Sequence, residues 1–301
     1  MRMRTHALAA AGMLAGASSA AFAAPFFSDT FDTAGSSANW LTTTVAGAGD
    51  TVTYGFDYST KGLPEAPNTP SLTVATRGLF IQTNKNIATG VINGLNVTAS
   101  AGGVAINFNQ DIKMTFDMWL GVDPTLVSTT EQALYGINTD GAGVNSRTGA
   151  TQSAADGVWY HVAGEGGYGN TSTTPNSRDV VNYINNGVSG RLDNAEAPFP
   201  ALFPNGPLVG TPGNSWVRVE ISEVGGNVKM LMNGGVIFDV ANTGPTSGSV
   251  FLGYQDPFSG SLGSNALQFG VFDNVVVEAV PEPTSLAIVG VAALAALRRR
   301  R

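Results

Sequence analysis

The chain has 301 residues, no cysteine and a formal net charge of −7, which excludes disulfides, thiol catalysis and cysteine-ligated metals. Six of its fifteen basic residues lie at positions 2, 4 and 298 to 301, so the stretch from Ala24 to Leu297 has nine against 22 acidic residues, a balance of −13. Nucleic acid repels so acidic a body, and we therefore exclude nucleic-acid binding.

The N-terminus has the three parts of a secretory signal peptide. Arg2 and Arg4 give a positive start, Ala7 to Ala17 is apolar, and Ala21 and Ala23 are the small residues that signal peptidase requires. We predict a signal helix over residues 1–23, which signal peptidase removes before Ala24. The apolar run is too short to span a bilayer unaided. The alternative is a buried N-terminal helix.

Residues 24–279 form a single predicted β domain. Short segments rich in β-branched and aromatic residues are bounded by Gly, Asn, Asp or Pro, and no segment has a sustained helical period. The predicted strands are Thr51–Phe56, Leu79–Gln82, Val104–Phe108, Ile112–Leu120, Val158–Ala163, Trp216–Glu223, Val228–Met232, Val236–Val240, Val250–Tyr254 and Leu267–Val277.

Two of these strands alternate between apolar and polar residues. The first places Ile112, Met114, Phe116, Met118 and Leu120 on one face, and Lys113, Thr115, Asp117 and Trp119 on the other. The second places Val217, Val219 and Ile221 opposite Trp216, Arg218, Glu220 and Ser222. A period of two with one apolar face indicates half-buried antiparallel strands. Asn233-Gly234 suits a tight hairpin turn, and so many short strands predict a two-sheet sandwich.

The span from Asp123 to Asn214 is dense in Gly, Asn, Thr and Ser. Only Val158–Ala163 and Arg178–Ile184 are predicted as strands within it. Long loops of this kind gather at an edge of a sandwich or over one sheet, where ligands are often bound. The alternative is that they are surface loops without function.

The C-terminus, residues 280–301, has three ordered elements. Pro281, Glu282 and Pro283 precede the uncharged segment Leu286–Leu297, and Arg298, Arg299, Arg300 and Arg301 close the chain. Twelve helical residues reach only about 18 Å, so the segment inserts into a bilayer with help from flanking arginines, tilt or thinning. The arginines are expected to stay cytoplasmic, with the body outside.

This tail resembles the PEP-CTERM sorting signal of Gram-negative bacteria. The resemblance implies an apolar sorting helix, transient anchoring in the inner membrane, and removal of the tail by an exosortase-type protease. It also implies delivery of the body to the outer surface or to an exopolysaccharide matrix. The alternative is a plain tail anchor.

Blocks across the body carry a second resemblance. Phe27–Asp32, Asn227–Val240 and Val271–Glu278 resemble the concanavalin A-like, laminin-G-like sandwich, whose first and last strands pair. With Phe56–Asn68, Thr76–Asn84, Phe116–Gly121 and Phe251–Phe258, they resemble a group of exported PEP-CTERM proteins without an assigned activity. This resemblance implies an all-β, concanavalin A-like jelly roll and an exported location, but no reaction.

Catalysis has little support in the sequence. His161 is the only histidine outside the signal segment, and no G-x-S-x-G motif occurs. A glycosidase needs two carboxylates across the scissile bond. Laminarinase-type enzymes of this fold place acids on alternate strand residues, whereas Asp117 is followed by Trp119 and Gly121. We therefore assign no catalytic residue.

Glycan binding requires an aromatic face and short polar side chains. Asp117 and Trp119 share the non-core face of one predicted strand, and Trp159, Tyr168 and Asn170 lie in the glycine-rich span that would fold over it. We predict a ligand site from these five residues. The alternative is that Trp119 is covered and forms a second layer of core.

No cofactor is required by the sequence, but a structural calcium ion is one hypothesis. Pairing of the terminal strands would bring Asp29 and Asp32 near Asp273 and Asn274, and Ca²⁺ favours such oxygen ligands. Turn capping by Asp and Asn is the competing account.

The sequence thus favours a secreted β-sandwich that binds glycan or exopolysaccharide without catalysis and meets a membrane only through its tail. A structural or adhesive envelope protein without a small ligand is the first alternative, and a glycoside hydrolase is the second.

Overall fold

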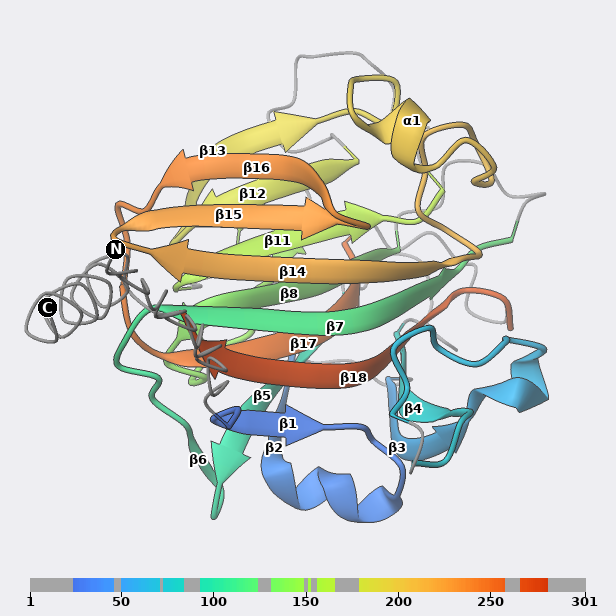
Figure 1. Cartoon of the computed structure of the whole chain (residues 1–301), viewed down its shortest axis with the longest axis horizontal. Coiled ribbons are helices and arrows are strands. Elements are labelled where there is room, and N and C mark those ends of the chain that lie inside the picture. Colours follow the sequence, from blue (N-terminus) through green and yellow to red (C-terminus); the bar gives the residue numbers. More distant parts are fainter. Residues whose placement is uncertain are drawn as a thin grey trace, which may run out of the picture.

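The computed structural model describes residues 24–45, 50–70, 73–83, 93–123, 131–148, 151–152, 156–165, 179–257 and 266–280. These residues form two antiparallel sheets packed face to face (Figure 1), so the predicted all-β sandwich is confirmed. The signal helix and the sorting helix fall at residues 1–23 and 281–301, outside the described residues. Within the described ranges, the structure has no helix with the length and apolarity needed to cross a bilayer.

One sheet, here called the front sheet, contains both terminal strands of the sandwich. Its order is β16 (Gly235–Ala241), β15 (Asn227–Met232), β14 (Trp216–Val224), β7 (Ile112–Gly121), β18 (Phe269–Ala279), β4 (Arg77–Gln82) and β3 (Thr51–Asp57). The short strand β1 (Phe27–Asp29) also pairs with β18, with Phe27 opposite Val277. The predicted pairing of the first and last strands is therefore confirmed.

The second sheet, here called the back sheet, packs behind the first (Figure 1). Its order is β13 (Gly187–Leu192), β12 (Val180–Ile184), β11 (Val158–Ala163), β8 (Gln132–Thr139), β17 (Ser249–Asp256), β5 (Asn93–Ala101) and β2 (Trp40–Val45), with β6 (Val104–Ala105) on β5. The remaining elements are β9 (Arg147–Thr148), β10 (Thr151–Gln152), the 3-10 helices η1 (Ala34–Asn39) and η2 (Tyr58–Lys61), and α1 (Phe199–Leu202).

The core lies between the sheets and follows the alternation in the sequence. All five apolar residues of β7 from Ile112 to Leu120 are buried, as are Val217, Val219 and Ile221 of β14. Each such side chain contributes about 1.5–3 kcal/mol when it leaves water. Alternation therefore decides which face of these strands points outward.

The hairpin between β15 and β16 turns at Asn233 and Gly234, as predicted. Both residues have positive φ, 48° and 80°. A two-residue turn of this kind matches the right-handed twist of the paired strands, which is why Asn-Gly is favoured there.

The glycine-rich span contains more sheet than its composition predicts. β8 and β13 both lie within it, and β8 pairs with β11 and β17 in the middle of the back sheet. Conversely, predicted strand Val104–Phe108 is reduced to Val104–Ala105, and Phe108 makes only an isolated bridge to Gly248. Every residue of β8 is buried, so this strand lacks the apolar and polar alternation that identifies an open face.

Candidate functional site

Two tryptophans lie side by side on the outer face of the front sheet. Trp119 of β7 is the cross-strand partner of Trp216 of β14. Their rings meet edge to face with centroids 5.7 Å apart, and both side chains are half-buried. We call them the tryptophan pair.

The segment that follows β3 holds the tryptophan pair in place. Tyr58 of η2 packs edge-on against Trp216 at 5.3 Å, and the Trp216 indole N–H donates to the Pro64 carbonyl at 2.8 Å. Both tryptophans pack on a buried cluster of Tyr58, Leu63, Phe80, Phe269 and Val271. The pair is therefore fixed on one side and partly open on the other.

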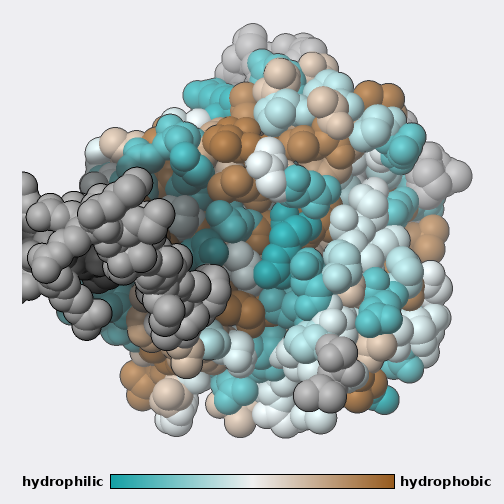
Figure 2. Space-filling view, in the orientation of Figure 1, coloured by the Kyte–Doolittle hydropathy of each residue, from teal (hydrophilic) through white to brown (hydrophobic). Residues whose placement is uncertain are grey.

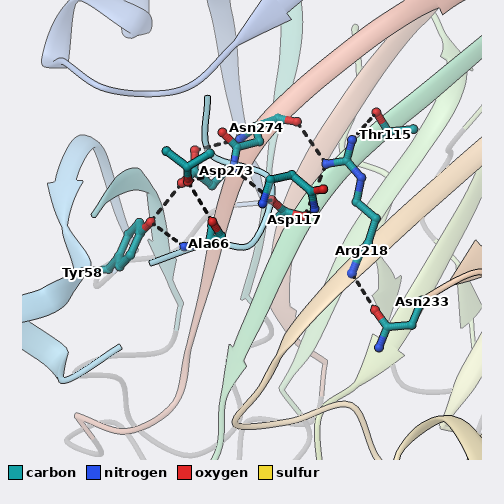
Figure 3. Close-up of polar contacts among 10 residues, drawn as sticks. Tyr58, Ala66, Thr115, Asp117, Arg218, Asn233, Asp273 and Asn274 are labelled. Carbon is teal, nitrogen blue, oxygen red and sulfur yellow. Dashed lines mark hydrogen bonds and ion pairs between the residues drawn. The ribbon is translucent and has the colours of Figure 1, made fainter. Parts of the chain in front are cut away.

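Asp117 lies two residues before Trp119 in β7, but it is sealed from solvent. Its side chain is 0% exposed. Its oxygens accept hydrogen bonds from the Asn68 backbone N–H (3.3 Å), the Asn68 amide (2.6 Å) and the Asn274 amide (2.9 Å), and Arg218 lies 3.3 Å away (Figure 3). Four donors occupy the carboxylate, so Asp117 fixes Asn68 and the segment around it, and no acceptor remains for a ligand.

Asp273 of β18 lies directly opposite Asp117. It accepts from the Tyr58 hydroxyl at 3.1 Å and from the Asn274 backbone N–H at 2.7 Å (Figure 3). Burial raises the pKa of Asp273 to about 8, the Asp117 and Asp32 carboxylates act in the same direction, and the two hydrogen bonds oppose the shift. Both carboxyl groups of this cross-strand pair are buried, so a substrate cannot reach either of them.

The predicted grouping of Trp159 with Trp119 is not found. Trp159 belongs to β11 in the back sheet, where it is fully buried and stacks on Tyr183 with ring centroids 3.9 Å apart. Its indole N–H donates to the Asn185 carbonyl at 2.9 Å. Tyr168 and Asn170, the other two residues expected over this face, lie outside the described residues.

His161 also belongs to the back sheet and is fully buried. Its Nδ1 lies 3.0 Å from the Tyr183 hydroxyl, and burial raises the pKa of Tyr183. The histidine is held within the sheet rather than presented to solvent.

The residues proposed for calcium divide into separate hydrogen-bonded groups. Asp29 accepts from the Phe31 backbone, Ser36, Asn39 and Trp40, and Asp32 accepts from Thr30 and the Val74 backbone. Donors thus surround both carboxylates, which is the turn-capping arrangement. The described residues contain no group of three or more His, Cys, Asp or Glu side chains suited to a metal ion. These contacts do not fit a calcium site that includes Asp29.

Sequence reasoning missed Trp216 as a site residue. Its place on the non-core face was predicted, but the register that sets it opposite Trp119 cannot be read from either strand alone. Tyr58, Pro64 and Asn68 lie in a segment singled out only for its resemblance to other proteins. Their contacts with Trp216 and Asp117 depend on how that segment folds back over β7.

The open face of the front sheet is mixed in character. Figure 2 shows a hydrophilic band across its middle and hydrophobic side chains above the band, over β15 and β16. Val236 of β16 is 47% exposed. The Arg218 backbone N–H donates to the side-chain oxygen of Asn233 at 2.9 Å, while the Arg218 guanidinium group points away from Asn233, toward Thr115 and Asp117 (Figure 3).

Comparison with known proteins identifies the tail and gives relatives of the fold. Residues 279–301 match the family model of the PEP-CTERM protein-sorting motif, which indicates an exported protein sorted to the cell surface in Gram-negative-type bacteria. No curated protein matches the chain in sequence.

Three of the solved structures with a similar sandwich are a protein of unknown function, a carbohydrate recognition domain and a lyase. A protein of unknown function with a galectin-like fold from Bacillus subtilis is 11% identical, covers 86% of this chain and 97% of its own, and has a TM-score of 0.47. The Emp47p carbohydrate recognition domain is 14% identical, with 72% and 95% coverage and a TM-score of 0.43. The alginate lyase AlgAT5 of Polysaccharide Lyase family 7 is 13% identical, with 60% and 67% coverage and a TM-score of 0.36. Such distant similarity concerns the fold alone.

Proposed function

We propose that this protein is an exported, surface- or matrix-sorted glycan-binding module without catalytic activity. The observation that carries the proposal is the tryptophan pair, two half-buried indoles held rigidly next to each other on an open sheet face. Indole faces pack on the C–H surfaces of sugars, and a platform that is already ordered loses little entropy when it binds.

Polar groups for sugar hydroxyls lie on the same face. Arg218 is 30% exposed at its side chain, and Asn233 is exposed. Both lie on or next to β14, the strand that carries Trp216. Aromatic surface with a few fixed polar groups is the usual composition of a saccharide site. Asp117 is buried and bonded to Asn68 and Arg218, so it holds these side chains in place and does not contact the ligand.

The route to the surface follows from the two ends of the chain. Signal peptidase removes residues 1–23, the tail at 280–301 passes through the inner membrane, and an exosortase-type protease processes it. The released body then meets exopolysaccharide or other glycans outside the cell. Its acidic balance favours neutral glycans over anionic surfaces.

A glycan array with the purified protein tests the proposal. Trp119→Ala and Trp216→Ala should each weaken binding at least about tenfold, because each removes half of the platform. Val236→Ala is the matched control, since it truncates an exposed apolar residue on a neighbouring part of the same sheet. Binding that survives both tryptophan variants, with their fold intact, would move the site elsewhere.

A structural envelope protein is the second candidate function. It is favoured by one observation, that Trp119 and Trp216 pack on the buried cluster around Phe80. If the tryptophans serve only as an outer layer of core, their alanine variants will lower the melting temperature and the parent protein will bind no glycan on the array. Loss of binding without loss of fold separates the two functions.

The absence of catalysis has its own test. Incubation with β-glucans should release no reducing ends, because Asp117 and Asp273 are both buried and bonded. Reducing ends that disappear in Asp117→Asn would instead establish a hydrolase.

A further inference from the structure

A separate pocket of about 380 Å³ lies between β6, the end of β8 and the loop that leads into β17. The polar residues among its described lining are Asn107, Asn138, Thr139, Asp140, Asp156, Ser247 and Ser249. Asn138 is hydrogen-bonded to Glu223, which lies near the C-terminal end of β14, whereas Trp216 is the first residue of that strand. The pocket is therefore distinct from the tryptophan pair.

One carboxylate shapes the pocket wall and another is left open to it. Asp156 accepts from the Thr139 hydroxyl and from the Asp140 backbone N–H, both at 2.7 Å, so its two oxygens hold the turn after β8 in place. Asp140 is exposed, and one of its oxygens accepts the Ala142 backbone N–H at 2.7 Å. Its second oxygen has no partner in the described part of the chain.

The back of the pocket is a strained and tightly packed corner. Asn138 has φ 62° although it lies within β8, and a Cβ on Gly248 would come within 2.5 Å of the Asn138 backbone. Asn138 is 1% exposed, and its amide donates to Glu223 and to the Pro245 carbonyl. Its side-chain oxygen has no hydrogen-bond partner among the described residues, which is unusual for a buried amide.

A further carboxylate lies behind Asn138. Glu223 is 2% exposed, and its oxygens accept the side-chain amides of Asn138 and Asn242. Neither partner carries a positive charge. The described lining of the pocket also contains no Lys or Arg, so Asp140, Asp156 and Glu223 give this corner a negative potential with no cation beside it.

These features define the class of ligand. Negative potential repels uronates and phosphates and attracts a cation. The exposed amide of Asn107 and the half-buried hydroxyl of Ser247 suit a ligand with hydroxyl groups. The volume is at the small end of ligand sites, the size of one or two sugar units. No group of three metal-binding side chains occurs within the described ranges, which disfavours a bare metal ion.

We propose that this pocket binds an amino-sugar unit, with the ammonium group on Asp140 and the hydroxyl groups on Asn107 and Ser247. The site is independent of the tryptophan pair and of the glycan that binds there.

Titration of the full chain with glucosamine, N-acetylglucosamine and glucuronate tests this inference by calorimetry and by backbone amide shifts. Glucosamine should bind at least about tenfold more tightly than N-acetylglucosamine under mildly acidic conditions, because only the free amine carries a charge for Asp140. Glucuronate should not bind. Amide shifts should be centred on Ile106, Asp140 and Gly248.

Two variants with the same change in net charge complete the test. Asp140→Asn should weaken glucosamine at least about tenfold and leave N-acetylglucosamine unchanged. Asp239→Asn removes an exposed carboxylate on β16 and should leave both affinities unchanged. Equal affinity for the two sugars, no binding of either, or an Asp140→Asn protein that binds like the parent would each overturn the inference. Trp119→Ala should not alter this binding.

Discussion

At the scale of single residues, two buried carboxyl groups, Asp117 of β7 and Asp273 of β18, face each other as cross-strand partners in the front sheet. Arg218 lies 3.3 Å from Asp117 and compensates that carboxylate, whereas Asp273 is bonded to the neutral Tyr58 hydroxyl and a backbone N–H. Two buried carboxylates with one cation cannot both ionise cheaply. Burial raises the pKa of Asp273 to about 8, so this carboxyl group retains a proton at neutral pH.

Asp273 should make the protein less stable as pH rises. Its pKa in the folded state is about 8, mainly because of burial, against 3.8 as the ordinary value. Between these values the folded state retains a proton that the unfolded state has lost, so the free energy of unfolding falls by on the order of 1 kcal/mol per pH unit and levels off above the folded pKa. Urea unfolding from about pH 5 to pH 9 should show this slope.

The variant Asp273→Asn supplies the control for this slope. An amide keeps the size of the protonated carboxyl group but does not titrate, so its unfolding curve should depend less on pH than that of the parent. If the parent and the variant have parallel stability profiles, Asp273 is ionised throughout this pH range, and another group causes the pH dependence of the free energy of unfolding.

At the scale of elements, how well sequence predicts a strand depends on whether one face is open. β7 and β14 alternate because their outer faces reach solvent or polar contacts, and both were predicted almost to their ends. β8 is buried on both sides, so its sequence shows no alternation of apolar and polar residues. It also contains Gly136, where the neighbouring atoms leave no room for a side chain. For both reasons the composition of this segment predicts a loop. The tryptophan pair needs the register between β7 and β14, and the corner at Asn138 needs three segments to meet. Neither is encoded in a local pattern.

Gly136→Ala should be strongly destabilising. A Cβ at this position would come within 2.4 Å of the Val158 carbonyl oxygen and 2.7 Å of Phe251. Because β8 is flanked by β11 and β17, the backbone cannot move aside, and we expect a loss of at least about 2 kcal/mol in the free energy of unfolding. Chemical denaturation of the purified variant measures it.

A glycine in a turn provides the comparison for this substitution. Gly234→Ala meets no atom within 4 Å but retains φ 80°, so it should cost only about 1 kcal/mol, from backbone strain alone. Equal losses in the two variants would show that crowding does not govern β8.

At the scale of the whole molecule, the terminal strands are joined by backbone pairing and by the contacts of Asp29. β1 pairs with β18, and Asp29 links β1 to η1 and to the Trp40 indole.

Because these bonds already occupy the Asp29 carboxylate, chelation with EDTA should leave the melting temperature unchanged. Asp29→Ala should lower the melting temperature, because four donors lose their acceptor. We expect the free energy of unfolding to fall by at least about 2 kcal/mol. A fall in melting temperature on chelation, reversed by added calcium, would instead restore the metal hypothesis.

The position of the tail relative to the tryptophan pair has a consequence for binding. The described chain ends where Ala279 pairs with Ile112 and the Val280 N–H donates to the Asp111 carbonyl at 3.1 Å. Trp119 lies seven residues further along β7, or about 23 Å at the usual rise of a strand. The end of β18 and the proposed glycan face are therefore well separated on the same sheet, so anchoring at one end leaves the other free.

We accordingly expect the tail to govern location and not affinity. A chain that ends at Val280 should appear in the medium, whereas the full chain should sediment with membranes when the sorting protease is missing. Its affinity for any glycan found on the array should match that of the full chain within about twofold, because the tryptophan pair, Pro64 and Tyr58 are all retained. A shortened chain that folds but no longer binds would show that the tail contributes to the site, and the tryptophan pair would then not be sufficient.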